Sequence, residues 1–88
     1  METQAILANV LAHRLDAEHR HPSMKSIDQW SEVLTDRLTA LLEQMVDTQT
    51  EVTRCDASRT AAQLAGLCVR LIEEAGWPLS HPVQPEAI

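Results

Sequence analysis

Hydrophobic residues recur every three or four positions over residues 26–47, which is the most regular pattern in the chain. The apolar positions are Ile27, Trp30, Val33, Leu34, Leu38, Leu41, Leu42 and Met45. This spacing puts them on one face of an α-helix. Ser26 and Gln29 have the spacing of a capping box, which satisfies free N–H groups at a helix start. The pattern predicts a long amphipathic helix whose apolar face needs cover from other helices of this chain or of a second copy.

A shorter helix is predicted before it, over residues 3–19. Its apolar residues fall on one face: Ile6, Leu7, Val10, Leu11 and Leu15. The helix ends at His21-Pro22, because a proline disfavours helical backbone at the residue before it. The connection to the next helix is short, so we expect the first two helices to pack as antiparallel neighbours.

A third helix is predicted over residues 57–75, ended by Gly76 and Pro78, a glycine and proline order that is typical of helix C-termini. We expect Leu67 at the flank of its core face, which comprises Ala61, Leu64, Ala65, Cys68, Leu71 and Ile72. Small side chains in the first half of this helix would let another helix approach it closely.

The start of the third helix has two possible positions. Thr48 and Glu51 have capping-box spacing, which would begin the helix early. Alternatively Asp56 or Ser58 is the N-cap. We favour the later start, with a loop or frayed turn over 48–56.

These elements predict an all-α protein, a three-helix up-down bundle over residues 1–76 with an extended, proline-rich tail over 77–88. A chain of 88 residues buries a modest core, and we expect homo-oligomerisation to complete it. The residues expected at the interface with another copy or partner are Trp30, Leu34, Leu38, Leu41, Met45, Ala61, Ala65 and Trp77.

Charge and composition exclude several functions. The formal net charge is −6 and Lys25 is the only lysine, which argues against direct binding of nucleic acid. No apolar run approaches the roughly 20 residues that a membrane-spanning helix needs. Two cysteines make no disulfide framework, and the N-terminus has no basic signal-peptide region. We therefore expect a cytoplasmic protein with reduced thiols.

No catalytic or metal-binding motif stands out from the spacing of reactive residues. The serines lie in no glycine-flanked elbow, and we interpret Cys55 as a surface thiol and Cys68 as a small core residue. His13, His19 and His21 lack the tight spacing of zinc ligands, so we interpret them as a polar helix end. A line of carboxylates at Asp28, Glu32 and Asp36 is most simply a solvated helix face.

Three segments taken together resemble small phage and bacterial members of the all-α nucleotide pyrophosphohydrolase family, the MazG-like proteins. These segments read ILANVLAHRLDAEHRHP, then WSEVLTDRL, then RTAAQLAGLCVRLIEE, and the resemblance covers roughly residues 5–75. It implies a helical fold whose members associate as dimers or tetramers, with helices from two chains paired in one bundle. It also implies a magnesium site built from carboxylates on two helices.

The chain departs from the family at that magnesium site. The corresponding positions hold Asp36, Arg37 and Ala40, then Thr60 and Gln63, so Asp36 alone keeps a carboxylate. Arg37 puts a cation where the resemblance implies a Mg²⁺ ligand. One carboxylate and a carboxamide are too few to hold Mg²⁺ against its hydration shell.

We therefore expect a non-catalytic helical protein that acts through protein–protein contacts and has no cofactor. A phage-type accessory factor that inhibits a host defence complex is one concrete form. Two alternatives stay open. One is a divergent Mg²⁺-dependent nucleoside triphosphate pyrophosphohydrolase that uses Asp36, Glu32 and Gln63, and the other is a purely structural dimerisation module.

Overall fold

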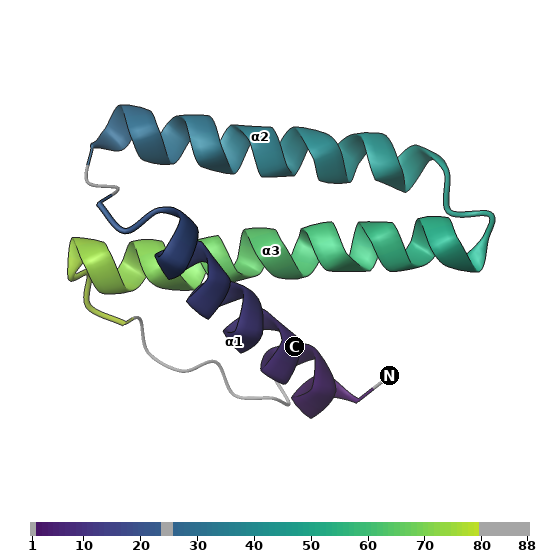
Figure 1. Cartoon of the computed structure of the whole chain (residues 1–88), viewed down its shortest axis with the longest axis horizontal. Helices are drawn as coiled ribbons and strands as arrows, with labels where there is room; N and C mark the ends of the chain where they lie inside the picture. The colour runs from purple at the N-terminus through teal and green to yellow at the C-terminus, as the bar shows by residue number, and fades with distance from the viewer. Residues whose placement is uncertain (1, 24–25, 80–88) are drawn as a thin grey trace.

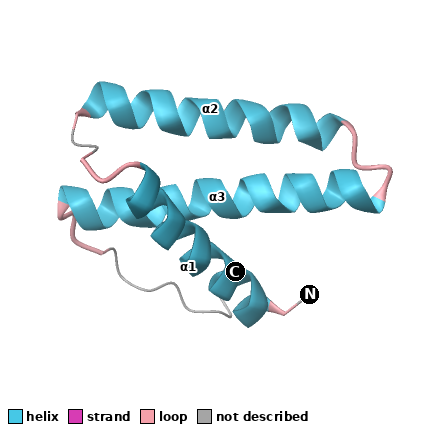
Figure 2. Cartoon of the chain, viewed as in Figure 1, coloured by secondary structure: helices cyan, strands magenta, loops and turns pink. Residues whose placement is uncertain are grey.

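The protein consists of three α-helices in a computed structural model that describes residues 2–23 and 26–79 (Figure 1). Helix α1 spans Thr3–Arg20, α2 spans Ile27–Val46 and α3 spans Glu51–Ala75. The described residues contain no strand (Figure 2), which confirms the predicted all-α fold. None of these helices, within the described ranges, is both long and apolar enough to cross a membrane.

Helix α3 lies at the centre of the arrangement. Figure 1 shows α2 running antiparallel beside α3, whereas α1 crosses α3 obliquely near its C-terminal half. In the part of the chain that the structure describes, the backbones of α1 and α2 each pack against α3 and not against each other. The expectation that the first two helices pair as antiparallel neighbours was therefore wrong.

Gly66 explains why α1 packs on α3. A Cβ atom placed on Gly66 would lie 2.7 Å from the backbone N of Arg14 and 2.9 Å from the carbonyl carbon of His13. The backbones of the two helices therefore meet at a point where no side chain fits between them. The small-residue stretch of α3 does admit a second helix closely, as its composition predicts.

An ion pair joins the same two helices at their C-terminal ends. The Arg14 Nε donates to a carboxylate oxygen of Glu73 on α3 at 2.7 Å, and Arg14 also pairs with Glu18 on its own helix. Hydrogen bonds to Glu73 and then Glu18 raise the pKa of the Arg14 guanidinium above its ordinary value. Arg14 thus stays charged throughout the working pH range and joins α1 to α3 through Glu73.

The core lies where the three helices meet. Ala17 of α1, Trp30 of α2 and Leu67 of α3 are buried together, and the partly buried Val33, Leu34 and Leu71 pack around them. No large side chain in the described ranges is fully buried. The single chain therefore has a small hydrophobic core for its length.

Three of the four helix ends that the sequence marks are predicted correctly, and one of them is the end of α1 just before His21-Pro22. Ser26 Oγ accepts from Gln29 N at 3.1 Å, and Gln29 Oε1 accepts from Ser26 N at 3.2 Å, so the capping box of α2 is complete. Gly76 ends α3 with φ of 68°, the left-handed conformation that glycine adopts without strain.

The start of α3 differs from the favoured prediction. The helix begins at Glu51, so the predicted loop over 48–56 is mostly helical. Its N-cap is Thr50, whose hydroxyl accepts from Thr53 N at 3.1 Å, and neither Asp56 nor Ser58 serves as the cap. The earlier of the two predicted starts is the closer one, shifted by two residues because Thr50 and Thr53 satisfy each other's backbone N–H groups.

The buried face of α3 also differs from the prediction. Ala61, Cys68 and Ile72 are exposed, although their spacing placed them in the core. The buried residues of α3 are Thr60, Ala62, Gly66, Leu67 and Arg70. Helices α1 and α2 pack beside the row of Ala61, Cys68 and Ile72 and leave these three residues exposed.

The described part of the tail, Trp77 to Leu79, has no regular secondary structure and is exposed. The rest of the predicted extended tail, residues 80–88, lies outside the described residues.

Candidate functional site

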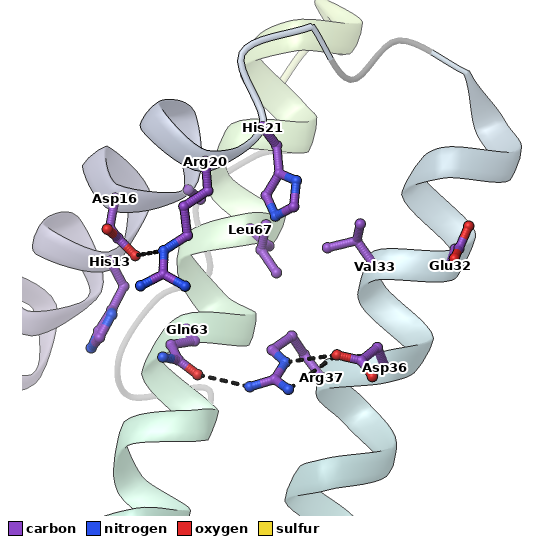
Figure 3. A pocket seen from close by; sticks show the side chains of 11 residues that line it. His13, Asp16, Arg20, His21, Glu32, Val33, Asp36, Arg37, Gln63 and Leu67 are labelled. Atoms are coloured by element: carbon purple, nitrogen blue, oxygen red, sulfur yellow. Dashed lines mark hydrogen bonds and ion pairs between the residues drawn. The ribbon is translucent and has the colours of Figure 1, made fainter.

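A cavity of about 430 Å³ opens between the three helices, on one side of the core (Figure 3). Helix α3 supplies its floor with Gln63 and Leu67, and α1 and α2 supply its two walls. The lining residues are His13, Asp16, Ala17, Arg20, His21, Glu32, Val33, Asp36, Arg37, Gln63 and Leu67. The three positions named for the enzyme alternative, Asp36, Glu32 and Gln63, therefore border one cavity.

Arg37 lies between two of those three positions. Its Nη1 donates to Gln63 Oε1 at 3.1 Å, and its Nη2 and Nε donate to Asp36 Oδ2 at 3.0 and 3.2 Å (Figure 3). The guanidinium thus neutralises Asp36 and joins α2 to α3. A cation of the protein occupies the space between the carboxylate and the carboxamide.

Glu32 does not join this network. It lines the cavity by position, but Figure 3 shows its carboxylate directed away from Arg37 and Gln63. Among the described residues, no group of three or more His, Cys, Asp or Glu side chains is arranged to hold a metal ion. The donor set at Asp36 and Gln63 does not fit Mg²⁺, which prefers several oxygen ligands in octahedral geometry.

Helix α1 contributes a second charged pair to the cavity. Arg20 Nε pairs with Asp16 Oδ2 at 2.8 Å, one helical turn apart. His13 projects from the same helix, and His21, the half-buried residue that follows α1, points toward Leu67 (Figure 3). His19 is exposed and does not line the cavity.

Sequence reasoning missed the contribution of α1 to this cavity. The sequence predicts His13 and His21, together with His19, as a polar helix end, and it assigns no role to Asp16 or Arg20. Except for His19, these residues line the same cavity as Arg37 because α1 crosses α3 obliquely. No local sequence pattern predicts that crossing. The resemblance alone placed Asp36 and Gln63 together.

A second feature is a row of exposed apolar residues on each helix, and we call the three rows together the apolar face. The rows are Leu7, Leu11 and Leu15 on α1, Leu38, Leu42 and Met45 on α2, and Ala61, Cys68 and Ile72 on α3. Each large side chain among them keeps between 38% and 62% of its surface exposed.

The apolar face lies on the opposite side of each helix from the cavity. Residues nine positions apart lie about two and a half turns apart, on opposite sides of an α-helix. Leu11 stands in this relation to Arg20, Met45 to Asp36, and Ile72 to Gln63. Each helix therefore turns a polar side to the cavity and carries an apolar row on its opposite side.

The residues predicted for an interface divide between the core and this face. Trp30 is buried within the single chain, and Leu34, Leu41 and Ala65 are half-buried. Leu38, Met45 and Ala61 belong to the apolar face, and Trp77 is exposed just after α3. Both cysteines are free and exposed, Cys55 outside the apolar face and Cys68 within it.

No protein-family model matches the sequence, and comparison with curated proteins and with solved structures gave no match either. The resemblance to the MazG-like proteins is therefore a prediction, and the function has to be argued from the cavity and the apolar face.

Proposed function

We propose that the protein is a non-catalytic helical assembly protein that works as a homodimer joined through the apolar face. The observation that carries this proposal is the exposure of an apolar row on each of the three helices, on the side of the helix away from the cavity. Burying such rows is the main favourable term in helix association.

A second copy is the occupant that best suits this face. The rows on α2 and α3 contain no charged residue, although the chain carries a net charge of −6. An uncharged apolar surface is complementary to itself, as an isologous dimer interface requires. A basic partner would instead need the acidic residues, which lie away from the rows on α2 and α3.

The molar mass in solution tests this proposal, with one variant on the face and one away from it. We expect light scattering to give twice 9.8 kDa for the unaltered chain. Leu38→Lys should yield a folded monomer, because it puts a charge into the interface, where burial without a partner is costly. Val52→Lys, which alters a 69% exposed residue of α3 outside the face, should leave the dimer intact.

Two results would contradict the proposal. A mass of 9.8 kDa for the unaltered chain at high concentration would show that the chain is a monomer. Equal disruption by Val52→Lys and Leu38→Lys would place the interface elsewhere. Circular dichroism on each variant separates loss of the dimer from loss of the fold.

The accessory-factor form of this proposal adds a second protein to the dimer. Its support is the acidic surface that remains after the apolar faces are paired. We expect an acidic inhibitor to lose affinity for its target as salt rises, because screening weakens exposed charge pairs. A purely structural dimerisation module would capture no partner at any salt concentration.

Nucleotide hydrolysis is the weaker candidate. Asp36 and Gln63 do border one cavity, but Arg37 binds both of them. We expect no Mg²⁺-dependent release of pyrophosphate from nucleoside triphosphates. Release that disappears in Asp36→Asn would instead establish the enzyme alternative.

A further inference from the structure

We propose that the cavity binds a small organic anion, with its phosphate or carboxylate group between Arg20 and Arg37 and a short apolar body against Ala17, Val33 and Leu67. This inference rests on the cavity alone and is independent of the dimer on the opposite side.

The arginine side chains of the cavity keep hydrogen-bond donors that they do not use within the protein. Arg20 uses Nε for Asp16, and its Nη1 and Nη2 make no hydrogen bond within the described ranges. Figure 3 shows this guanidinium directed into the cavity. An arginine held through Nε presents its two terminal amino groups as a fork, which suits the two oxygens of a carboxylate or phosphate.

Arg37 and Gln63 present donors from the facing side. Gln63 uses its Oε1 to accept from Arg37, so its amide NH₂ remains as a donor. The bonds to Asp36 and Gln63 fix the Arg37 guanidinium in place, and an arginine has five N–H groups, more than these bonds use. The imidazoles of His13 and His21 each add an N–H group to the lining.

The carboxylates around the cavity do not block an anion. Asp16 and Asp36 are each paired with an arginine, and Glu32 points away from the arginines (Figure 3). The charges of Asp16 and Asp36 offset the two guanidinium groups in the empty cavity, and Glu32 leaves three carboxylates against two guanidinium groups, a formal charge of −1 on the lining. An anion would therefore meet donors that are already ordered, at little conformational cost.

The volume of the cavity and its apolar residues limit the size and polarity of the uncharged part of the ligand. A volume of about 430 Å³ is within the range of small-molecule sites. Ala17, Val33 and Leu67 offer apolar surface beside the donors, so an anion with a small hydrophobic body suits the site better than a bare inorganic ion.

Nuclear magnetic resonance titration tests this inference with four probes that share one aromatic body. Benzoate and phenyl phosphate carry an anionic group, benzyl alcohol is neutral and benzylamine is a cation. We expect the two anions to shift the backbone amides of residues lining the cavity, and the tighter of the two identifies the preferred head group. Benzyl alcohol and benzylamine should bind at least tenfold more weakly, because charge-assisted bonds would be missing.

Three variants locate the binding. Arg20→Gln should weaken binding of the better anion about tenfold, and Arg20 is exposed enough for the fold to survive its replacement. Arg37→Gln should have a similar effect. Arg59→Gln, at an exposed arginine of α3 outside the cavity, should leave binding unchanged. Equal binding of the neutral probe and the anions, or equal effects of Arg20→Gln and Arg59→Gln, would overturn the proposal.

Discussion

Arg70 links all three helices through one buried side chain. Its Nη1 donates to the carbonyl oxygen of Ala17 in α1 at 3.2 Å, and its guanidinium carbon lies 6.0 Å from the centre of the Trp30 ring in α2. Glu74, one turn further along α3, keeps a carboxylate 3.8 Å from Nη2. A buried arginine is costly unless it is paired, and here a carbonyl, a ring face and a carboxylate share its charge.

Replacing Arg70 by methionine should therefore destabilise the fold while keeping much of the side-chain volume. We expect the free energy of unfolding to fall by about 2 kcal/mol, from the lost charged hydrogen bond and the lost cation–π contact. Urea unfolding measures this change. Arg59→Met, at an exposed arginine of the same helix, is the control and should change stability little. A methionine variant as stable as the parent would show that Arg70 contributes packing alone.

At the scale of the element, the sequence predicts which segments are helical more accurately than it predicts which helices pack together. Hydrophobic spacing and the Ser26 capping box predict α2 closely, and Gly76 marks the end of α3. The start of α3 was misplaced because several threonines and an aspartate compete as caps over 48–58. Local patterns decide which segments are helical, since these interactions lie within a few residues of one another.

The packing faces were harder to predict because an apolar row shows that a helix face favours burial but does not show which helix buries it. The row of Ala61, Cys68 and Ile72 is regular, yet α1 and α2 pack elsewhere on α3. What decides the packing is the absence of a side chain at Gly66, which lets α1 approach. The resemblance predicts that Asp36 and Gln63 lie near each other. It does not predict that Arg20 lines the same cavity, because that depends on how α1 packs on α3.

Substitution of Gly66 by alanine tests the contact between α1 and α3. Alanine favours a helix over glycine by about 1 kcal/mol, so an isolated α3 would gain stability. The added Cβ would meet the α1 backbone at 2.7 Å, and we expect a net loss of about 1–3 kcal/mol. Thermal unfolding should show a lower melting temperature for Gly66→Ala. Ser58→Ala, at an exposed position of α3, should show none of this loss, and a stabilised Gly66→Ala would contradict the close approach.

At the scale of the whole molecule, the two sides of the helix arrangement suit two kinds of contact. Each helix lines the cavity, with its paired arginines, on one of its sides and carries an exposed apolar row on the other. A dimer joined through the apolar faces would leave both cavities open to solvent. Assembly and ligand binding would then proceed without competing for the same residues.

The two native cysteines allow the most direct measurement of whether a second copy covers the apolar face. Both thiols are free and exposed in the single chain, with Cys68 in the apolar face and Cys55 outside it. Alkylation of each, followed by mass spectrometry over a range of protein concentrations, compares their rates within one sample. We predict that Cys68 becomes progressively slower than Cys55 as concentration rises. A ratio of rates that stays constant up to high concentration would contradict the dimer.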